Sequence, residues 1–491
     1  MKTWYILLAA VAVVTAVAVA AVVIMDSDGS AQEYRFQTYE VSCKDNVELP
    51  VYYGDYFFKK PSTEMNGDLM AFALGLELSS GIKANDRSAS VLNLLKEIGC
   101  ENARPNDVYS KVPTIETTDV AIGSKEWKGY NLIFVVLNGT LYSNESAANV
   151  MLGAEGNHQG FMYACNAGLE ELRDFIEDNN ITGKTKILVT GYSRTAAGAN
   201  LMAAYIADAI AEGKVDERIG NIKLSKEDVY GFSFETPLGG YYERGKGMVS
   251  PTDPRYDGIW YVTNPDDPVT YVPTKNYNFV RYGQHYVIQS HDETIKANMM
   301  DNAEYYYGEK TAEWVDMSRF KKVPLIGVDY PSEIYDGFLD RFFSELGSRE
   351  FYHENIEEDF VQFIYVLENH PDVLMEILNQ SEDLVSFVKA LYNYSGDQEK
   401  FDEYFGPIVK AALAKYHYEY YSKNVLNSFY QIANLVRSYF EGGIASIVLD
   451  PYIMSALFNL EVLLMPHLPS MTYCYIIQES SFYEIPAESD K

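Results

Sequence analysis

Short apolar runs alternate with amphipathic stretches from about residue 41 to residue 293. Residues 131–137 and 186–190 are apolar runs of strand length, a pattern that favours strands buried on both faces of a sheet. Residues 166–179 carry apolar side chains at helical spacing, and residues 194–211 are rich in alanine, so both segments are predicted to be helices. Strands that alternate with helices indicate an α/β fold with a mostly parallel central sheet.

The pattern changes after residue 293. Between residues 294 and 450, apolar residues recur every three or four positions and strand-like runs are few, so this region is predicted to be helical. We interpret it as a large helical insertion. The predicted organisation is therefore an α/β core over residues 41–293, the insertion over residues 294–450, and a return to the core over residues 451–491.

The beginning of the chain has a different character. An uncharged apolar run occupies residues 4–25, directly after Lys2 and directly before Asp26. As a helix it would extend about 33 Å, enough to cross the hydrocarbon core of a bilayer. The flanking charges favour an N-terminus inside and a body outside the cytoplasm. Residues 1–25 are thus expected to anchor the body to the cell membrane, or to be a cleaved signal peptide that releases it. The polar residues 26–40 are expected to be a tether.

The chain is strongly acidic. Acidic residues outnumber basic residues by 70 to 39, which gives the 491 residues a formal net charge of −31. This charge argues against nucleic acid as a partner, because phosphates need a basic surface. It also argues against electrostatic attraction to anionic lipid heads, so contact with a membrane is expected only through the N-terminal helix. The four cysteines contain no C-x-x-C pair, and no cysteine-based metal site is predicted.

The sharpest local motif is Thr190-Gly-Tyr-Ser-Arg-Thr-Ala196, which lies where a predicted buried strand meets a predicted helix. A serine at such a junction occupies a tight turn, and the N–H groups of the helix N-terminus face any oxyanion formed on a bound substrate. Ser193 is therefore a candidate nucleophile, and an ordinary N-cap serine is the alternative. Thr195 stands where a second glycine is usual, and its β-branched side chain is expected to crowd the turn.

A nucleophilic serine needs a histidine as base and a carboxylate that orients the histidine. A predicted strand at residues 259–263 runs into Asn264-Pro-Asp-Asp-Pro-Val269, so a carboxylate there would lie at the same sheet edge as the serine. The histidines that follow are His285, His291, His353, His370, His417 and His467. Their positions favour two of them: His467, in a proline-flanked loop after the helical region, and His291, soon after the acid segment.

Six separated segments have a further property in common. They are Asn138-Gly-Thr140, His158-Gln-Gly-Phe161, Gly191-Tyr-Ser-Arg-Thr-Ala-Ala197, Ser233-Phe-Glu-Thr-Pro237, Asn264-Pro-Asp-Asp-Pro-Val269 and His467-Leu-Pro-Ser-Met-Thr-Tyr473. In this order they resemble the characteristic motifs of the fungal-lipase-like family, the class 3 lipases, and especially of its large prokaryotic members. The resemblance covers about residues 50–290 and 460–478, and it leaves out the helical region between them.

The resemblance implies an α/β-hydrolase fold and a serine hydrolase of carboxylic esters, a lipase or esterase that acts on acylglycerol-like or other lipid esters. It implies Ser193 as nucleophile, Asp267 as orienting acid and His467 as general base. It also implies that the backbone N–H groups of Thr140 and Arg194 form an oxyanion hole. No metal and no organic cofactor are expected for this chemistry.

Two positions depart from the family pattern, since Asn138 replaces an arginine and Thr195 replaces a glycine. They leave a second interpretation open, in which the chain keeps the hydrolase fold but serves as a binding or structural protein without turnover. A peptidase that uses the same three residues is a third interpretation. His158, which the resemblance brings near the site, is expected to be a structural residue at the start of a helix.

Overall fold

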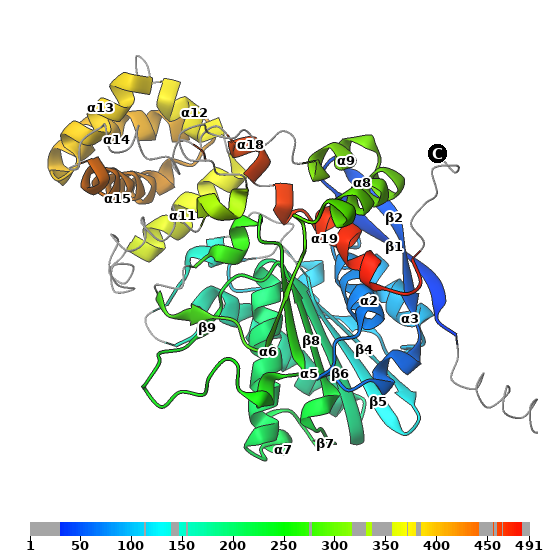
Figure 1. Cartoon of the computed structure of the whole chain (residues 1–491). Helices are drawn as coiled ribbons and strands as arrows, with labels where there is room; N and C mark the ends of the chain where they lie inside the picture. Colours follow the sequence, from blue (N-terminus) through cyan, green and yellow to red (C-terminus); the bar gives the residue numbers. More distant parts are fainter. Residues whose placement is uncertain are drawn as a thin grey trace, which may run out of the picture.

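The computed structural model describes residues 30–111, 114–138, 147–153, 156–273, 277–316, 330–335, 356–370, 372–379, 384–440, 455, 459–463 and 465–483 (Figure 1). The centre of the fold is an eight-stranded sheet with the strand order β12-β10-β8-β6-β5-β4-β3, in which β7 pairs with β6. The strands are β3 (Arg104–Pro105), β4 (Val120–Trp127), β5 (Tyr130–Leu137), β6 (Gly183–Tyr192), β7 (Ile222–Lys223), β8 (Val229–Phe234), β10 (Ile259–Thr263) and β12 (Gln284–Val287).

The sheet is mostly parallel, as the sequence predicts. All pairs from β12 to β5 and the β6–β7 pair are parallel, and only β3–β4 and β4–β5 are antiparallel. Residues 132–137 of β5 and 185–192 of β6 are buried, because helices cover both faces of these apolar strands. The register pairs Leu137 with Gly191, so β5 and β6 end at the same edge of the sheet.

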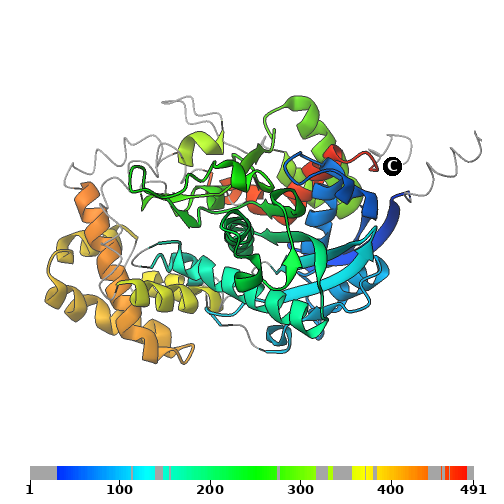
Figure 2. The ribbon, with the colours of Figure 1, turned by 90° about the horizontal axis from the view of Figure 1, so that it is seen from below.

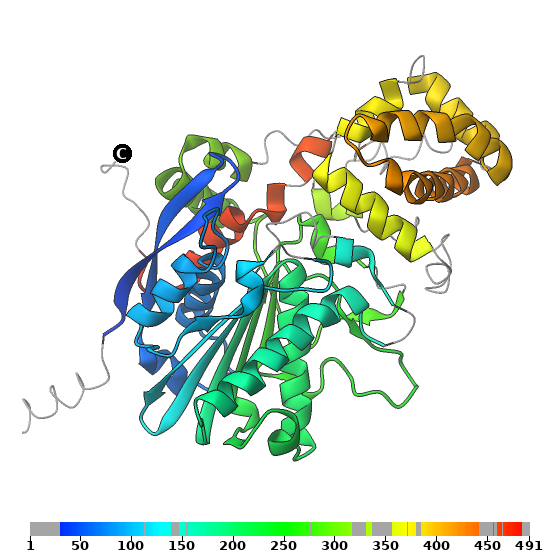
Figure 3. The ribbon, with the colours of Figure 1, turned by 180° about the vertical axis from the view of Figure 1, so that it is seen from behind.

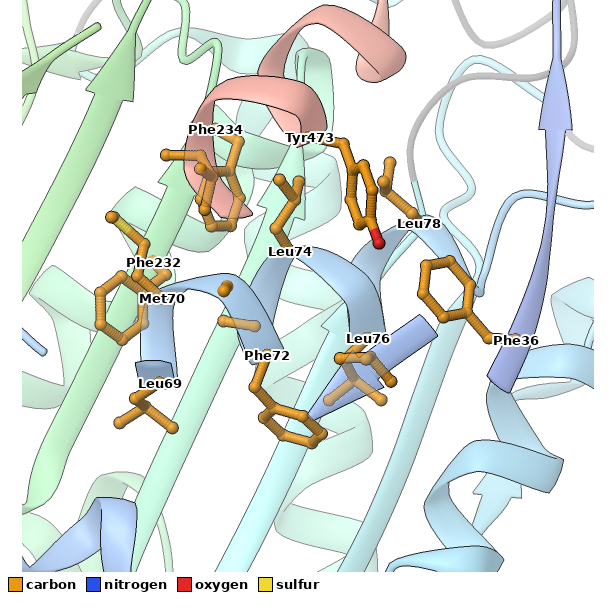
Figure 4. Close-up of a cluster of buried hydrophobic side chains, with 14 of the residues drawn as sticks. Phe36, Leu69, Met70, Phe72, Leu74, Leu76, Leu78, Phe232, Phe234 and Tyr473 are labelled. Carbon is orange, nitrogen blue, oxygen red and sulfur yellow. The ribbon is translucent and has the colours of Figure 1, made fainter. Parts of the chain in front are cut away.

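One face of the sheet is covered by α5 (Gln159–Asp178) and α6 (Arg194–Ala211), whose apolar side chains share a core with β5 and β6. The other face is covered by α2 (Gly67–Leu78) and α19 (Pro469–Ile476). Figure 4 shows Leu74 of α2 between Phe234 of β8 and Tyr473 of α19. The fold thus has helices on both faces of a central sheet, which is consistent with an α/β-hydrolase.

The helix α2 is apolar on nearly all sides, and residues 69–78, Glu77 among them, are all buried. A helix of this kind needs a second covering layer. That layer contains the antiparallel hairpin of β1 (Gln32–Glu40) and β2 (Asp45–Tyr53), together with α3 (Ala89–Glu97). Part of the segment predicted as a tether is therefore a strand. In β1 every second residue is buried, since Phe36, Thr38 and Glu40 lie between more exposed neighbours. The polar composition of the segment makes this alternation hard to recognise in the sequence.

Helices fill the described part of residues 293–440. They are α8 (Glu293–Tyr307), α9 (Glu309–Val315), α11 (Ile356–Asn369), α12 (Asp372–Asn379), α13 (Leu384–Tyr394), α14 (Gln398–Ala414) and α15 (Ser422–Phe440). The first two, α8 and α9, join the core beside α19, whereas α11–α15 enclose a core of their own. Seen from behind or from below, α11–α15 lie to one side of the sheet and the β1–β2 hairpin lies at the other (Figure 2, Figure 3).

The remaining short elements lie at the edges of the core. They are α7 (Val215–Arg218), α18 (Leu460–Leu463) and the two-residue strands β9 (Gly240–Tyr241) and β11 (Phe279–Val280), which pair with each other. The predicted domain boundaries at residues 293 and 450 stay predictions. Residues 441–454 lie outside the described residues.

The expectation of a membrane-anchored body must be corrected. Among the residues that the structure describes, no helix has both the length and the apolar character needed to cross a membrane. The apolar run at residues 4–25 lies outside the described residues. The predicted anchoring by an N-terminal helix is contradicted by this finding, and the placement outside the cytoplasm, which depended on the same run, is not retained.

Candidate active site

Ser193 occupies a strained turn between β6 and α6. Its backbone has φ 55° and ψ −127°, a left-handed conformation that is uncommon for a residue with a side chain. The turn is held by a hydrogen bond from the Ser193 N–H to the carbonyl of Phe234, at 3.0 Å. A Cβ atom on Gly191 would lie 2.4 Å from the Thr195 carbonyl oxygen, so the turn requires a glycine there. This geometry presents a serine hydroxyl at the C-terminal edge of the sheet.

Thr195 does not crowd the turn as the sequence suggests. Its side chain is fully buried, and its hydroxyl lies 3.0 Å from the carbonyl oxygen of Leu137 and 2.9 Å from that of Tyr192. The hydroxyl therefore stabilises the contact between the end of β5 and the turn itself. The β-branched side chain is accommodated because its hydroxyl finds hydrogen-bond acceptors although it is buried.

Three side chains that are far apart in the sequence form a hydrogen-bonded series. Nε2 of His467 lies 2.8 Å from Oγ of Ser193, and Nδ1 of His467 lies 2.7 Å from Oδ2 of Asp267. Asp267 is fully buried and caps the short helix η7 (Pro268–Tyr271), where Oδ1 accepts a hydrogen bond of 2.8 Å from the Val269 N–H. The two distances from His467, to Ser193 and to Asp267, are in the range in which an imidazole can take a proton from a hydroxyl while a carboxylate orients the imidazole.

His291, the second histidine that the sequence favours, belongs to a different pair. Its Nε2 atom lies 2.8 Å from Oδ2 of Asp266, and its ring stacks on Tyr330 with 3.7 Å between the ring centroids. Neighbouring aspartates, Asp266 and Asp267, thus bind different histidines. The structure brings His467, and not His291, into hydrogen-bonding contact with Ser193.

His467 is held through its backbone as well as its ring. It ends the short helix η12 (Met465–His467), which directly precedes α19. The hydroxyl of Tyr192, the residue before the candidate nucleophile, donates a hydrogen bond of 3.0 Å to the carbonyl oxygen of His467. The same hydroxyl lies 3.0 Å from Oγ1 of Thr472. The segment that carries the imidazole is therefore fastened to the strand that carries the serine.

Glu235 is a buried polar residue of this site for which the sequence predicts no role. It follows β8, it is fully buried, and its φ is 47°. One carboxyl oxygen accepts a hydrogen bond of 2.7 Å from the Asn264 N–H, and the other lies 2.8 Å from Oγ1 of Thr472. Burial raises the pKa of Glu235 well above its usual value, and the charge of Asp267 raises it further. A glutamate directly after a mostly apolar strand is the signal that the sequence offers.

The predicted oxyanion hole is described only in part. Arg194 is the first residue of α6, so its N–H belongs to the helix N-terminus, where anions are favoured. Thr140 lies outside the described residues.

Asn138, the residue that departs from the family pattern, is buried and lies at the end of β5. Its Nδ2 donates a hydrogen bond of 3.0 Å to Asp119, and its Oδ1 accepts one of 3.1 Å from the Ser80 hydroxyl. Asp119 in turn forms a buried ion pair of 2.6 Å with Arg87. Asn138 is therefore part of a polar network that holds the end of β5 in place.

His158 caps the N-terminus of α5. Its Nδ1 accepts a hydrogen bond of 3.4 Å from the Phe161 N–H, its Nε2 lies 3.2 Å from the Asn149 carbonyl oxygen, and the side chain is fully buried. The ring also stacks on Phe161, with 3.9 Å between the ring centroids. These contacts fit the structural role expected for His158.

A cavity of about 160 Å³ opens beside the candidate nucleophile. Ser193 and His467 form part of its wall, and α2 and the segment after His467 supply the apolar side chains of Leu78 and Leu468. The buried carboxyl of Glu77 adds a polar patch. Within the described residues, no three His, Cys, Asp or Glu side chains are grouped so that they could hold a metal ion. The polar groups that line this cavity include the Ser193 hydroxyl, the His467 imidazole and the Glu77 carboxyl group.

Comparisons with known proteins return structural similarities only. No family model matches the chain, and no curated protein matches its sequence. The chain is similar to native Rhizomucor miehei lipase in its propeptide complex, with 19% identity over 37% of this chain and 56% of that one, and a TM-score of 0.26. It is similar to the Lip2 lipase from Yarrowia lipolytica, with 16% identity over 48% and 78% of the two chains and a TM-score of 0.28. It is also similar to M37 lipase, with 13% identity over 64% of this chain and 93% of that one, and a TM-score of 0.31.

The chain thus spans little more than half of the Rhizomucor miehei lipase in that complex. With TM-scores near 0.3, these similarities assign neither an activity nor a substrate to this chain.

Proposed function

We propose that this chain is a serine hydrolase that cleaves carboxylic esters. The observation that supports this most directly is the hydrogen-bonded series from Ser193 through His467 to Asp267, which starts at a strained turn between a strand and a helix. An N-cap serine, the alternative, would accept a hydrogen bond from its own helix, whereas the Ser193 side chain makes no capping bond. The resemblance to class 3 lipases in the six motifs supports the same reaction.

In the proposed reaction, Oγ of Ser193 attacks the ester carbonyl carbon while Nε2 of His467 takes the hydroxyl proton. Asp267 holds the proton on Nδ1, so that Nε2 is the free base, and it stabilises the imidazolium that forms. The tetrahedral oxyanion accepts hydrogen bonds from the N–H groups of Arg194 and Thr140, each of which contributes about 3 to 4 kcal/mol in comparable sites.

The imidazolium of His467 then donates its proton to the departing alcohol, and an acyl group remains on Ser193. Water attacks this acyl group with His467 again as base, which releases the carboxylic acid and restores the serine. Every proton in this sequence passes through Nε2 of one histidine, so the proton transfers involve only Ser193, His467, the leaving alcohol and water.

The first test of this proposal is covalent labelling with an alkyl fluorophosphonate. We expect the Ser193 oxygen to attack phosphorus and release fluoride, which leaves one phosphonyl group per chain, detectable by intact-protein and peptide mass spectrometry. Ser193→Ala should take up no label. A well-folded wild-type sample that takes up no label would instead favour a binding protein that retains the hydrolase fold without turnover.

The cavity beside Ser193 supports a preference for short acyl groups on lipid-like esters. Its volume of about 160 Å³ is smaller than the roughly 300–1,000 Å³ typical of sites for drug-sized ligands. A palmitoyl chain exceeds this volume, so many of its methylene groups would stay in water and would add little to binding. We therefore expect kcat/KM for p-nitrophenyl butyrate to exceed that for the palmitate by at least about tenfold.

The matched substrate for this measurement is the p-nitroanilide of the same butyryl group. An ester hydrolase should cleave the ester far faster than the anilide, whereas comparable rates would favour a peptidase. A palmitate rate equal to the butyrate rate would contradict the proposed acyl preference without affecting the proposed nucleophile.

A further inference from the structure

Glu235 connects all the segments that supply the proposed triad. It directly follows β8, whose last carbonyl, that of Phe234, holds the Ser193 turn. One carboxyl oxygen binds the backbone N–H of Asn264, which begins the loop that carries Asp267, at 2.7 Å. Glu235 is completely buried, so no solvent mediates these contacts, and its position beneath the site is fixed by them.

A chain of hydroxyl groups leads from Glu235 to the histidine. Oε1 of Glu235 lies 2.8 Å from Oγ1 of Thr472, and this hydroxyl lies 3.0 Å from that of Tyr192. The Tyr192 hydroxyl reaches the carbonyl oxygen of His467 at 3.0 Å. Because burial raises the pKa of Tyr192 well above its usual value, this hydroxyl keeps its hydrogen and can donate it to the carbonyl.

The carboxyl groups of Glu235 and Asp267 lie within hydrogen-bonding reach of each other. Both oxygens of Asp267 already accept hydrogen bonds, from Val269 N–H and from His467 Nδ1. Hydrogen bonds to the ionised form keep a carboxylate charged, so the negative charge belongs on Asp267. A second charge on Glu235 would then be buried beside a like charge, which is unfavourable.

Counting hydrogens leads to the same result. Four contacts need a hydrogen: Glu235 with Asp267, Glu235 with Thr472, Thr472 with Tyr192, and Tyr192 with the His467 carbonyl. The two hydroxyl groups supply only two hydrogens. A proton on Glu235 supplies a third, so a neutral Glu235 allows three of the four contacts to be satisfied, whereas two carboxylates allow only two.

The charged and titratable groups that face Glu235 are Asp267, Arg281, Tyr192 and, beyond Asp267, His467. Arg281 is the one cation in this set, and its guanidinium donates to the carbonyl oxygens of Thr236 and Thr270. Burial lowers the pKa of Arg281 to about 10. This one guanidinium interacts electrostatically with both carboxyl groups, so it can balance at most one of two negative charges.

We propose that Glu235 is a positioning residue, a neutral carboxylic acid that donates a hydrogen bond to Asp267 or Thr472 and so keeps the acid loop and the histidine segment in register with Ser193. This inference rests on the proposed ester hydrolysis. Glu235 touches neither substrate nor the reacting atoms, and it acts through Asp267 on one side and through Thr472 and Tyr192 on the other.

The test compares Glu235→Gln with Glu235→Ala. Glutamine is neutral, accepts from the Asn264 N–H and can donate from its amide, so kcat should stay close to the wild-type value. Alanine removes every contact, and we expect kcat to fall by about 10²-fold with little change in KM, because small misplacements of catalytic groups have effects of that size. Thr472→Val, which interrupts only the hydroxyl chain, should lower kcat in the same direction.

The pH profile separates a neutral glutamate from a charged one. If Glu235 is neutral, Glu235→Gln changes no charge near His467, and the acidic limb of kcat/KM should coincide with that of the wild type. A charged Glu235 would stabilise the imidazolium form of the general base, so its replacement by glutamine would move the acidic limb to lower pH. Such a shift would overturn the proposal.

A second measurement does not depend on turnover. The infrared difference spectrum of wild type minus Glu235→Gln at neutral pH should contain the carbonyl stretch of a protonated carboxyl group. A carboxylate band in its place would refute the neutral Glu235 even if the ester hydrolysis proves correct. Conversely, a protonated band in a protein that takes up no fluorophosphonate would leave the state of Glu235 intact and contradict the proposed function instead.

Discussion

Replacing His467 by alanine is expected to lower kcat for p-nitrophenyl butyrate by about 10⁴- to 10⁶-fold, the range found when the base of such a triad is removed. The reason is that Nε2 of His467 is 2.8 Å from the Ser193 hydroxyl, which is a poor nucleophile when no base accepts its proton. The measurement is the initial rate of p-nitrophenol release at saturating ester, on protein shown to be folded by circular dichroism.

His291→Ala is a closely matched control. Like His467, His291 is partly exposed, binds an aspartate and lies next to a tyrosine ring. Its removal should leave kcat near the wild-type value, while the loss of the partner of buried Asp266 destabilises the fold by about 1–3 kcal/mol. If His291→Ala loses turnover and His467→Ala retains it, the assignment of the base is wrong.

The second large effect is expected for Asp267→Asn, with about a 10⁴-fold loss of kcat, as measured for this substitution in a serine protease triad. The asparagine amide can still accept the Val269 N–H hydrogen bond through its oxygen, but its NH₂ group then faces Nδ1 of His467. This arrangement favours the tautomer with the proton on Nε2, which cannot accept the proton of Ser193.

Asp266→Asn tests whether the effect depends on position or only on charge. It removes the same charge one residue earlier, from a carboxylate that binds His291 and the Ser290 hydroxyl. We expect kcat to remain within the wild-type range and the thermal unfolding midpoint to fall. Equal losses of kcat in the two variants would show that the site responds to the electrostatics of the loop in general, and would contradict a specific role of Asp267.

The parts of this site that could be predicted are those whose residues lie close together in the sequence. The strand, the glycine, Ser193 and the following helix lie within a short segment, and hydrophobic periodicity locates their junction. The acid segment is likewise visible at the end of the strand at residues 259–263. The α/β class and the parallel sheet follow from the same alternation of patterns, because each buried strand is a continuous apolar run.

The choice between His467 and His291 could not be made from local patterns. Each histidine binds one of two adjacent aspartates, and only the return of α19 to the edge of the sheet decides which histidine meets Ser193. That return joins residues 200 positions apart, and it depends on packing that no window of the sequence contains. In the sequence, only the resemblance to a known family favoured His467.

Glu235 and Thr195 show a second limit. In the sequence, Glu235 is a charged residue after an apolar strand, and Thr195 is a bulky residue in a tight turn. Both become favourable only through partners from other segments, such as Thr472 for Glu235 and the Leu137 carbonyl for Thr195. Whether a buried polar group is satisfied depends on the three-dimensional arrangement, and residue type alone does not reveal it.

The dependence of the imidazole on α19 has a consequence for synthesis of the protein. The ribosome makes Ser193 and Asp267 long before residues 465–476, with the whole helical region in between, and chains begin to fold while they are still being made. The nascent sheet can therefore carry its serine for the time needed to translate some two hundred codons without the group that would activate it. For the proposed ester hydrolysis, this order of synthesis means that Ser193 has no base until the segment with His467 has been made and packed against the sheet.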